Sequence, residues 1–385
     1  MKTSLPWFVF AGGGTGGHLF PALAVVESLR AKDSSIDVSF FCTGRPIDQE
    51  ILNAAKIEAV PLAVQPFSTK PWHWPPFYIG WRRSIQFCRQ AFEKRRPALV
   101  VGAGGYASGP PVEVAGRRGI PTFLLNPDAV PGLANRRMAR TGRITTVFAQ
   151  WNVTRDCFPP SVPVAVTGCP VRAAFRAVEP SGIPTIRESF GLEPGRLTLL
   201  VTGASQGART INEAMMKLAE GITSTGWQVL HLSGMADRDR VADAYAEAKA
   251  RAPTFCYQVL PFTERMAEAM AACDLIVSRA GASTLAEIQA LGKPSVLFPY
   301  PFHRDQHQRH NARVLEQAGA AVLLKDLKEA GTNARQLEPV LSSCMRDEAK
   351  LAAMKQAACR LDRPDAADRM AEHLWQAVGR AKMNL

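Results

Sequence analysis

Two glycine-rich segments, one near the start of the chain and one at its middle, have the composition of an anion-binding loop. The first reads GGGTGGH over residues 12–18, and the second reads GASQGAR over residues 203–209. Each follows a short apolar run and precedes a helical pattern. Glycine lets the backbone approach a ligand closely, and the unpaired N–H groups of a first helical turn attract negative charge. One such loop is weak evidence, since any tight strand-to-helix turn favours glycine, but two predict a pair of Rossmann-like domains.

A polar cluster in the second half of the chain suits a ribose. The segment SRAGAST, residues 278–284, follows an apolar run, and Glu287 lies one helical turn after Ser283. Ser283 or Thr284 could cap the helix that begins here, and Glu287 could then reach back toward the loop. A carboxylate beside such a loop accepts hydrogen bonds from both hydroxyls of a ribose. The alternative is an ordinary helix cap with a solvated glutamate.

Histidines supply the candidate for proton transfer. His18 ends the first glycine segment, and we take it as the general base because histidine exchanges a proton near neutral pH. The alternative is a histidine at a helix start that bonds to backbone. Three more histidines, at 303, 307 and 310, lack the H-E-x-x-H pattern and any further ligand set. We therefore expect no metal and no other cofactor.

Apolar runs alternate with helical patterns and define the elements that must position these residues. We predict strands at 7–11, 36–42, 98–101, 121–125, 145–149, 163–166, 197–202, 227–232, 257–260, 274–277, 295–298 and 321–324. We predict helices at 20–31, 47–55, 80–95, 132–139, 211–221, 238–251, 264–272, 283–291, 306–318 and 364–380. Several strands are apolar without polar alternation, which is typical of parallel strands covered on both faces. This order predicts an α/β fold with two Rossmann-like domains facing a cleft.

Turn-rich sequence around residues 168–185 marks the predicted domain boundary. We expect an N-terminal domain of residues 1–168, a C-terminal domain of residues 169–362, and a last helix within 363–385 that packs back on the first domain. A chain of 385 residues has room for two such cores. Its hydrophobic content of 46% and charged content of 21% are those of a globular protein and exclude a disordered one.

The formal net charge of +12 is concentrated in the first half of the chain. Residues 70–96 combine seven Lys or Arg with a single Glu, and three tryptophans lie within residues 72–81. Tryptophan favours the headgroup boundary of a membrane, and Lys or Arg favours an anionic leaflet. The residues expected to dock on an anionic membrane are Trp72, Trp74, Phe77, Trp81, Arg82 and Arg83.

Prolines 71, 75 and 76 predict an apolar loop that leads into a basic helix. The alternative is that the aromatic side chains pack under that loop. We expect no nucleic acid partner, because no known binding module surrounds the patch. No run of about 18 apolar residues occurs, so we expect no membrane-spanning helix.

Six motifs in order resemble those of the MurG family of N-acetylglucosaminyltransferases. They are GGGTGGHLFPALAV (12–25), GAGGYASGP (102–110), GCPVR (168–172), GASQGAR (203–209), RAGASTLAEI (279–288) and DQHQRHNA (305–312). The resemblance implies a GT-B fold and a metal-independent, inverting transfer from UDP-GlcNAc. The implied acceptor is lipid I (undecaprenyl-pyrophosphoryl-MurNAc-pentapeptide), whose muramyl 4-hydroxyl is glycosylated to give lipid II for peptidoglycan. It also implies a peripheral protein on the cytoplasmic face of the bacterial plasma membrane.

The same resemblance assigns site residues. Ser205 and Arg172 match residues that contact the donor diphosphate. Thr263 matches a residue whose backbone contacts uracil. Glu287 matches the ligand of the ribose, and Gln308 matches a glutamine that binds the sugar hydroxyls. The remaining donor residues are Thr15, Gly16 and Gly17 near the sugar, with Ala282, Ser283, Thr284, Leu285 and Ala286 along the nucleotide. The implied acceptor-binding residues are Gly14, Tyr106, Ser108, Asp128 and Asn135.

One motif departs from the family pattern. Members usually carry Glu-Gln-Asn where this chain has Asn126-Pro127-Asp128, so Asn replaces a glutamate and Asp128 stands at the asparagine position. This departure leaves open a UDP-sugar-binding paralogue with an altered acceptor or without catalysis. A UDP-sugar epimerase of the same fold, which would bind the donor alike, is the other alternative. A dehydrogenase is least expected, because GGGTGGH lacks the G-x-G-x-x-G spacing and its later acidic residue.

Overall fold

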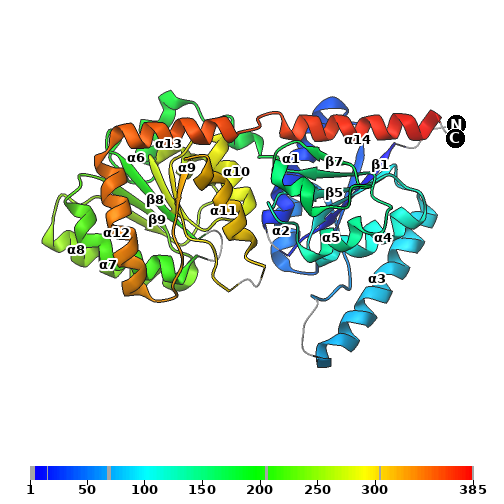
Figure 1. Cartoon of the computed structure of the whole chain (residues 1–385), viewed down its shortest axis with the longest axis horizontal. Coiled ribbons are helices and arrows are strands. Elements are labelled where there is room, and N and C mark those ends of the chain that lie inside the picture. The colour runs from blue at the N-terminus through cyan, green and yellow to red at the C-terminus, as the bar shows by residue number, and fades with distance from the viewer. Residues whose placement is uncertain (1–4, 15, 67–70, 204–206, 303–304, 384–385) are drawn as a thin grey trace. The chain divides into compact units, whose positions relative to one another are not determined.

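The apolar runs form two separate parallel sheets in the computed structural model, which describes residues 5–14, 16–66, 71–203, 207–302 and 305–383 (Figure 1). The chain divides into two units: residues 1–172 with 363–385 form the N-terminal unit, and residues 173–362 form the C-terminal unit. The division falls after Arg172, a few residues beyond the predicted 168.

The N-terminal unit contains a seven-stranded sheet of order β3-β2-β1-β4-β5-β6-β7, with every pair parallel. Its strands are β1 (Trp7–Gly12), β2 (Asp37–Cys42), β3 (Glu58–Pro61), β4 (Leu99–Gly104), β5 (Thr122–Asn126), β6 (Thr146–Ala149) and β7 (Val164–Val166). Its helices are α1 (Gly16–Lys32), α2 (Pro46–Ala54), α3 (Trp74–Lys94), α4 (Gly109–Arg117), α5 (Leu133–Ala139) and α14 (Ala366–Met383).

The C-terminal unit contains a six-stranded sheet of order β10-β9-β8-β11-β12-β13, again parallel throughout. Its strands are β8 (Thr198–Thr202), β9 (Gln228–Leu232), β10 (Tyr257–Leu260), β11 (Leu275–Ser278), β12 (Ser295–Leu297) and β13 (Ala321–Leu323). Its helices are α6 (Ile183–Ser189), α7 (Arg209–Thr223), α8 (Arg238–Arg251), α9 (Met266–Ala272), α10 (Ala282–Ala290), α11 (His307–Gln317), α12 (Ala330–Arg346) and α13 (Glu348–Leu361). The predicted α/β class with two Rossmann-like domains is confirmed.

Burial on both faces explains why the strands lack polar alternation. Along β1, Phe8 and Phe10 join the core beneath α1 and α14, whereas Trp7 and Val9 join the core on the opposite face. Successive side chains of a strand point to opposite faces, so a strand covered on both sides must be apolar at every position. Fully burying a phenylalanine contributes about 1.5–3 kcal/mol, which makes β1 a central anchor of this unit.

The last helix packs against the first one. Leu374 and Val378 of α14 join the core that contains Phe8, and the Trp375 ring lies 5.3 Å from that of Phe8. Ser28 of α1 donates a hydrogen bond of 2.5 Å to Asp368. The C-terminal segment therefore completes the N-terminal core.

The aromatic segment before residue 80 is helical, so the prediction of an apolar loop there was wrong. A short 3₁₀ turn (Pro71–His73) leads into α3, which begins at Trp74 with Pro75 and Pro76 in its first turn. Proline is accepted in a first turn because its missing N–H would have no intrahelical partner there. The first turns of α3 extend away from the sheet of their unit (Figure 1). Within the described residues, no helix has both the length and the hydropathy to cross a bilayer.

Candidate active site

Both sheets reverse their strand order at one point, and the sequence motifs gather there. The reversal lies between β1 and β4 in the N-terminal unit and between β8 and β11 in the C-terminal unit. Ligands of open α/β sheets bind outside the carboxyl ends of the strands at this switch point. The two glycine segments follow β1 and β8, and the segments beginning at Gly105 and Arg279 follow β4 and β11.

The first glycine segment contacts the loop after β4 backbone to backbone. Gly13, Gly14 and Gly105 have φ angles of +134°, +91° and +74°. A Cβ atom added to Gly105 would lie 2.8 Å from the Gly13 carbonyl oxygen, and one added to Gly12 would lie 2.9 Å from that of Gly104. Only glycine combines these φ angles with so close an approach.

Asp48 holds this segment, and sequence reasoning missed it. Its carboxylate is fully buried and accepts the Gly14 N–H, with 3.0 Å to each oxygen, and the Thr43 N–H at 3.3 Å. Burial, with a smaller contribution from the charge of Asp48, raises the pKa of the Cys42 thiol to about 11. An acidic residue in a first helical turn is ordinary helix chemistry, so the sequence carried no signal for this role.

His18 lies in the first turn of α1, half-buried, at the switch point. A Cβ atom on Gly104 would lie 3.2 Å from its Nδ1, so the imidazole lies against the bare backbone at the end of β4. The Phe20 ring covers Gly16 in the same way, and the Arg172 guanidinium lies 4.2 Å from the centre of that ring. The structure thus brings His18, Gly16 and Arg172 to one end of α1 in the N-terminal unit. Gly17 is exposed beside them, and Thr15 lies outside the described residues.

The predicted acceptor residues surround the loops after β4 and β5. Tyr106 is half-buried, with its ring edge 4.0 Å from where a Cβ atom of Gly14 would lie. Ser108 is buried and donates to the Gly105 carbonyl at 2.7 Å. Its hydroxyl therefore shapes the loop, whereas the Tyr106 side chain lines the loop's surface.

Buried side-chain amides hold the segment Asn126-Pro127-Asp128, where the chain departs from the family pattern. Asn126 donates to the Asp128 carbonyl at 2.7 Å, and Asn135 donates to the Asn126 side-chain oxygen at 3.0 Å. Asn126 and Asn135 are buried, while the Asp128 side chain is half-buried. The two asparagines fix the loop, and Asp128 is its ionisable group.

In the C-terminal unit, Glu287 lies on the second turn of α10. The helix begins at Ala282 with Gly281 as its N-cap, so the prediction of a Ser283 or Thr284 cap was wrong. Ser283, Thr284 and Glu287 are half-exposed, whereas Ala282, Leu285 and Ala286 have buried side chains. Ala282, Leu285 and Ala286 can therefore present only backbone atoms to a ligand.

Gln308 joins the loops after β11 and β12. Its side-chain oxygen accepts the Tyr300 N–H at 2.8 Å and the Ala280 N–H at 3.4 Å. Its amide nitrogen carries the donors suited to sugar hydroxyls. Thr263, after β10, is half-buried, and its hydroxyl accepts the Arg265 N–H at 3.1 Å, which closes a tight turn.

The second glycine segment rests on a buried polar network. A Cβ atom on Gly207 would lie 2.1 Å from the Ser233 carbonyl oxygen, which also accepts from Asn212 at 2.8 Å. Asn212 donates further to Asp237 at 3.0 Å and is 3.0 Å from Nε2 of His231. Burial lowers the pKa of His231 to about 3, so this histidine is neutral and structural. Ser205 lies outside the described residues.

An ion pair unforeseen from the sequence ties together the loops of the C-terminal unit. Arg279 donates to Asp326 at 2.7 Å, to the Thr210 hydroxyl at 2.9 Å and to the Phe298 carbonyl at 3.0 Å. The Asp326 side chain is fully buried and also accepts from Thr210 and Asn333. Burial opposes ionisation, but these hydrogen bonds outweigh it and hold the pKa of Asp326 below its usual 3.8. One pair thus connects elements that follow β8, β11, β12 and β13.

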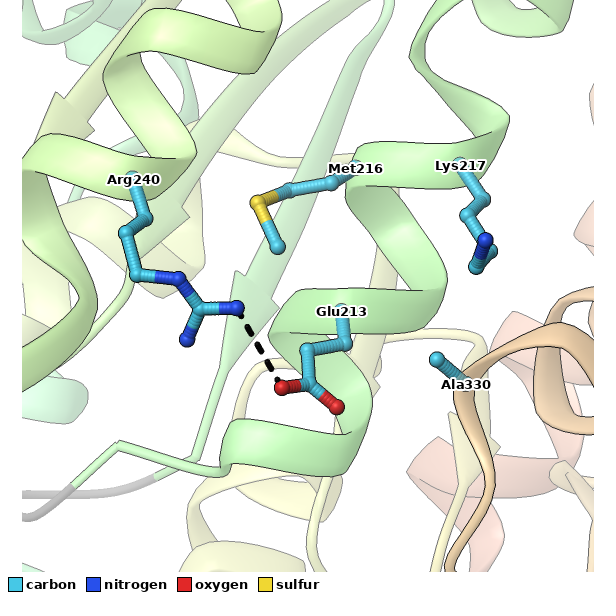
Figure 2. A pocket seen from close by; sticks show the side chains of 5 residues that line it. All are labelled: Glu213, Met216, Lys217, Arg240 and Ala330. Carbon is cyan, nitrogen blue, oxygen red and sulfur yellow. Dashed lines mark hydrogen bonds and ion pairs between the residues drawn. The ribbon is translucent and has the colours of Figure 1, made fainter.

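A pocket of about 350 Å³ between α7, α8 and the start of α12 contains none of the predicted site residues. Figure 2 shows that Glu213 and Arg240 point toward each other across it, and their ion pair measures 3.3 Å. Glu213 would repel an anion, and Lys217 is the only positive charge besides Arg240 among the described residues that line the pocket. Those lining residues also include no glycine segment such as those at the two switch points. Among the described residues, no group of three His, Cys, Asp or Glu side chains could hold a metal ion.

The predicted membrane residues fall into two groups. Trp72 and Trp74 are 68% and 42% exposed. Phe77 stacks on Trp81 at 6.0 Å, and Trp81 packs against Gly109 of α4. Arg82 and Arg83 are exposed. The first tryptophans therefore face solvent, while Trp81, with Phe77 stacked on it, attaches α3 to α4.

Two Rossmann-like units, each with a glycine segment at its switch point, form the two-domain architecture of the GT-B fold. The glycosyltransferase family 28 N-terminal domain matches residues 8–147, and the C-terminal domain of that family matches residues 198–370. The chain belongs to glycosyltransferase family 28 and, within it, to the MurG family.

Its relatives span nearly the whole chain. The UDP-N-acetylglucosamine--N-acetylmuramyl-(pentapeptide) pyrophosphoryl-undecaprenol N-acetylglucosamine transferase of Desulforamulus reducens is 34% identical, over 93% of this chain and 95% of that protein. The crystal structure of Acinetobacter baumannii MurG is 25% identical, with a TM-score of 0.73 over 96% of this chain and 99% of that one. The UDP-GlcNAc 2-epimerase of Neisseria meningitidis, bound to UDP-GlcNAc, is 14% identical, with a TM-score of 0.68 over 96% of this chain and 100% of that one. At 14% identity the similarity to this epimerase shows a shared fold and says nothing about the reaction.

Proposed function

We propose that this protein transfers N-acetylglucosamine from UDP-GlcNAc to the 4-hydroxyl of the muramyl sugar of lipid I, and so forms lipid II. The observation that carries the proposal is the placement of complementary groups at the two switch points. A histidine lies at the first, and a carboxylate and an amide lie at the second. The MurG-family relatives, matched over nearly their full length, support the same reaction.

The C-terminal unit binds the donor in this proposal. Glu287 accepts both ribose hydroxyls, the backbone at Thr263 pairs with uracil, and the Gln308 amide donates to the sugar. The first turn of α7 faces the diphosphate, where aligned N–H groups stabilise the charge that develops on departing UDP. Ser205 is expected at that diphosphate by family resemblance.

The N-terminal unit binds the acceptor and supplies the base. His18 takes the proton from the acceptor hydroxyl as its oxygen attacks the anomeric carbon and the bond to UDP breaks. This single displacement inverts the configuration at that carbon. Tyr106 and Asp128, which line the loops after β4 and β5, contact the acceptor.

The N-terminal unit also docks on an anionic membrane, since the acceptor is embedded in lipid. The docking surface consists of Trp72, Trp74, Tyr78 and Ile79, with Arg82 and Arg83 beside them. The four apolar members are between 42% and 68% exposed. Aromatic side chains favour the headgroup boundary, and each arginine near an anionic leaflet adds about 1 kcal/mol. In this proposal the protein is peripheral and acts at the cytoplasmic face of the plasma membrane, as the family resemblance implies.

Sedimentation with vesicles containing anionic lipid tests the docking surface. We expect Trp72→Ser/Trp74→Ser and Arg82→Glu/Arg83→Glu each to reduce bound protein at least tenfold. Lys249→Glu/Arg251→Glu, the same charge reversal on α8, is the control and should bind almost as wild type does. Binding that survives in both test variants would remove the docking surface from the proposal.

Incubation with radiolabelled UDP-GlcNAc, with and without lipid I, tests the reaction. Label transferred to lipid only when lipid I is present supports the proposal. Turnover of UDP-GlcNAc without any acceptor would select the epimerase instead. Binding of UDP-GlcNAc without turnover under either condition would select a paralogue that has lost catalysis.

A further inference from the structure

The buried carboxylate of Asp48 bridges two loops of the N-terminal unit. It belongs to the first turn of α2, yet it accepts the N–H of Gly14, after β1, and the N–H and hydroxyl of Thr43, after β2. The side chain is completely shielded from solvent. Hydrogen bonds to an ionised carboxylate are roughly twice as strong as neutral ones, so this is a firm attachment.

Asp48 and the glycines fit each other closely. A Cβ atom on Gly13 would lie 2.4 Å from the Asp48 carboxylate oxygen, so the carboxylate occupies space that only glycine leaves. Gly14 is bonded on both sides: its N–H donates to Asp48, and its carbonyl accepts from Arg45 at 2.9 Å. The Gly14 N–H is therefore directed into the protein, where an anionic ligand cannot reach it.

The start of α1 lies next to this attachment. The helix begins at Gly16, two residues after Gly14, and His18 lies in its first turn against Gly104. A shift of Gly14 would therefore move the start of α1 and the imidazole with it. Misplacement of a reacting group by about 1 Å can cost roughly 10²-fold in rate.

We propose that Asp48 is a positioning residue for transfer: it acts through Gly14 to hold the start of α1 and His18 in the reactive arrangement. The role in transfer rests on the function proposed above. Asp48 touches no substrate, so its contribution is to the rate of transfer and not to the affinity for UDP-GlcNAc.

The test compares Asp48→Asn and Asp48→Glu with a matched control. Asparagine keeps the volume, but in either orientation its NH₂ group would face the Gly14 N–H, while glutamate keeps two acceptor oxygens. Ser28→Ala removes a hydrogen bond between α1 and Asp368 at the other end of the same helix. This control loosens α1 without touching the glycine segment.

Two readouts separate positioning from general destabilisation. Hydrogen exchange of the Gly14 and Thr43 amides needs no reaction: it should accelerate at least tenfold in Asp48→Asn and stay unchanged in Ser28→Ala. In the transfer assay, kcat should fall about 10²-fold in Asp48→Asn, with an unchanged KM for UDP-GlcNAc, and less in Asp48→Glu.

Unchanged hydrogen exchange in Asp48→Asn would show that the Asp48 carboxylate does not hold the glycine segment. Wild-type kcat in Asp48→Asn, or an equal loss in Ser28→Ala, overturns the positioning role. Failure of the wild type to transfer sugar would instead refute the proposed function, and the exchange result would still report on the attachment.

Discussion

Removal of the Asp326 carboxylate should sharply destabilise the C-terminal unit. Asp326→Ala leaves the Arg279 guanidinium buried without its counter-charge, and the Thr210 hydroxyl loses its acceptor. Breaking a buried pair from one side costs about 3–5 kcal/mol, because the remaining charge stays desolvated. A typical domain has a free energy of unfolding of about 5–15 kcal/mol, so this loss is a large share of the total.

Urea unfolding measures the effect. With a denaturant slope of about 2 kcal/mol per molar, the midpoint for this unit should fall by roughly 1.5–2.5 M. Trp227 is the only one of the seven tryptophans within residues 173–362, and it is buried with its indole N–H on the Met345 carbonyl. Its ¹⁹F resonance in 5-fluorotryptophan-labelled protein therefore reports on this unit.

Asp239→Ala is the matched control. Its ion pair with Arg238 is 2.7 Å long, but the Asp239 side chain is 83% exposed, so the loss should stay below about 1 kcal/mol. Equal midpoint shifts in the Asp326 and Asp239 variants would refute the reasoning.

The pH dependence has a defined sign. The pKa of Asp326 lies below its usual 3.8 in the folded protein, so its stabilising contribution is complete above the unfolded pKa. It is lost as the pH falls through the folded pKa. Wild type should thus lose more stability than Asp326→Asn on acidification below about pH 4.

Three further predictions concern the proposed reaction. Glu287→Ala should weaken UDP binding at least tenfold by calorimetry, since charge-assisted hydrogen bonds to two hydroxyls contribute about 1.5–3 kcal/mol each; equal affinities of the wild type for UDP and 2′-deoxy-UDP would rule the assignment out. His18→Ala should lower kcat roughly 10²–10⁴-fold with nearly unchanged UDP-GlcNAc affinity; near-normal turnover would transfer the base role to Asp128. Asp128→Ala should raise the KM for lipid I and leave that for UDP-GlcNAc unchanged, so a change confined to the donor would place this loop on the donor side.

Uniformly apolar strands made most of the fold predictable. All twelve predicted strands exist, and β3 alone among the described strands was missed. It lies at the sheet edge, where Glu58 and Pro61 are exposed, so it lacks the apolar run of a central strand. The helices α4, α6, α12 and α13 were not predicted, although α12 is capped by Glu329, which accepts the Gly331 and Thr332 N–H groups. Glutamate is not a usual N-cap residue, so its sequence signal is weak.

The site was less predictable because half of it depends on contacts distant in sequence. Glycine loops and Glu287 follow strands directly, and a strand-to-helix pattern is enough to locate them. Asp48 binds Gly14, which is 34 residues away in the sequence. Asp326 binds Arg279, which is 47 residues away. Nothing in local spacing distinguishes such carboxylates from solvated ones until the sheet order brings the loops together.

The return of α14 to the N-terminal unit affects how the chain folds during synthesis. The core around Phe8 lacks Leu374 and Val378 until α14 leaves the ribosome. About 200 residues must be translated between the end of the first segment of this unit and that helix, which takes roughly 10–40 s at ordinary elongation rates. During this interval the surface of α1 that α14 covers is bare, and by its end the C-terminal unit is complete in sequence. The second half of the protein can therefore reach its native state before the first, and a nascent N-terminal unit needs protection from aggregation for that time.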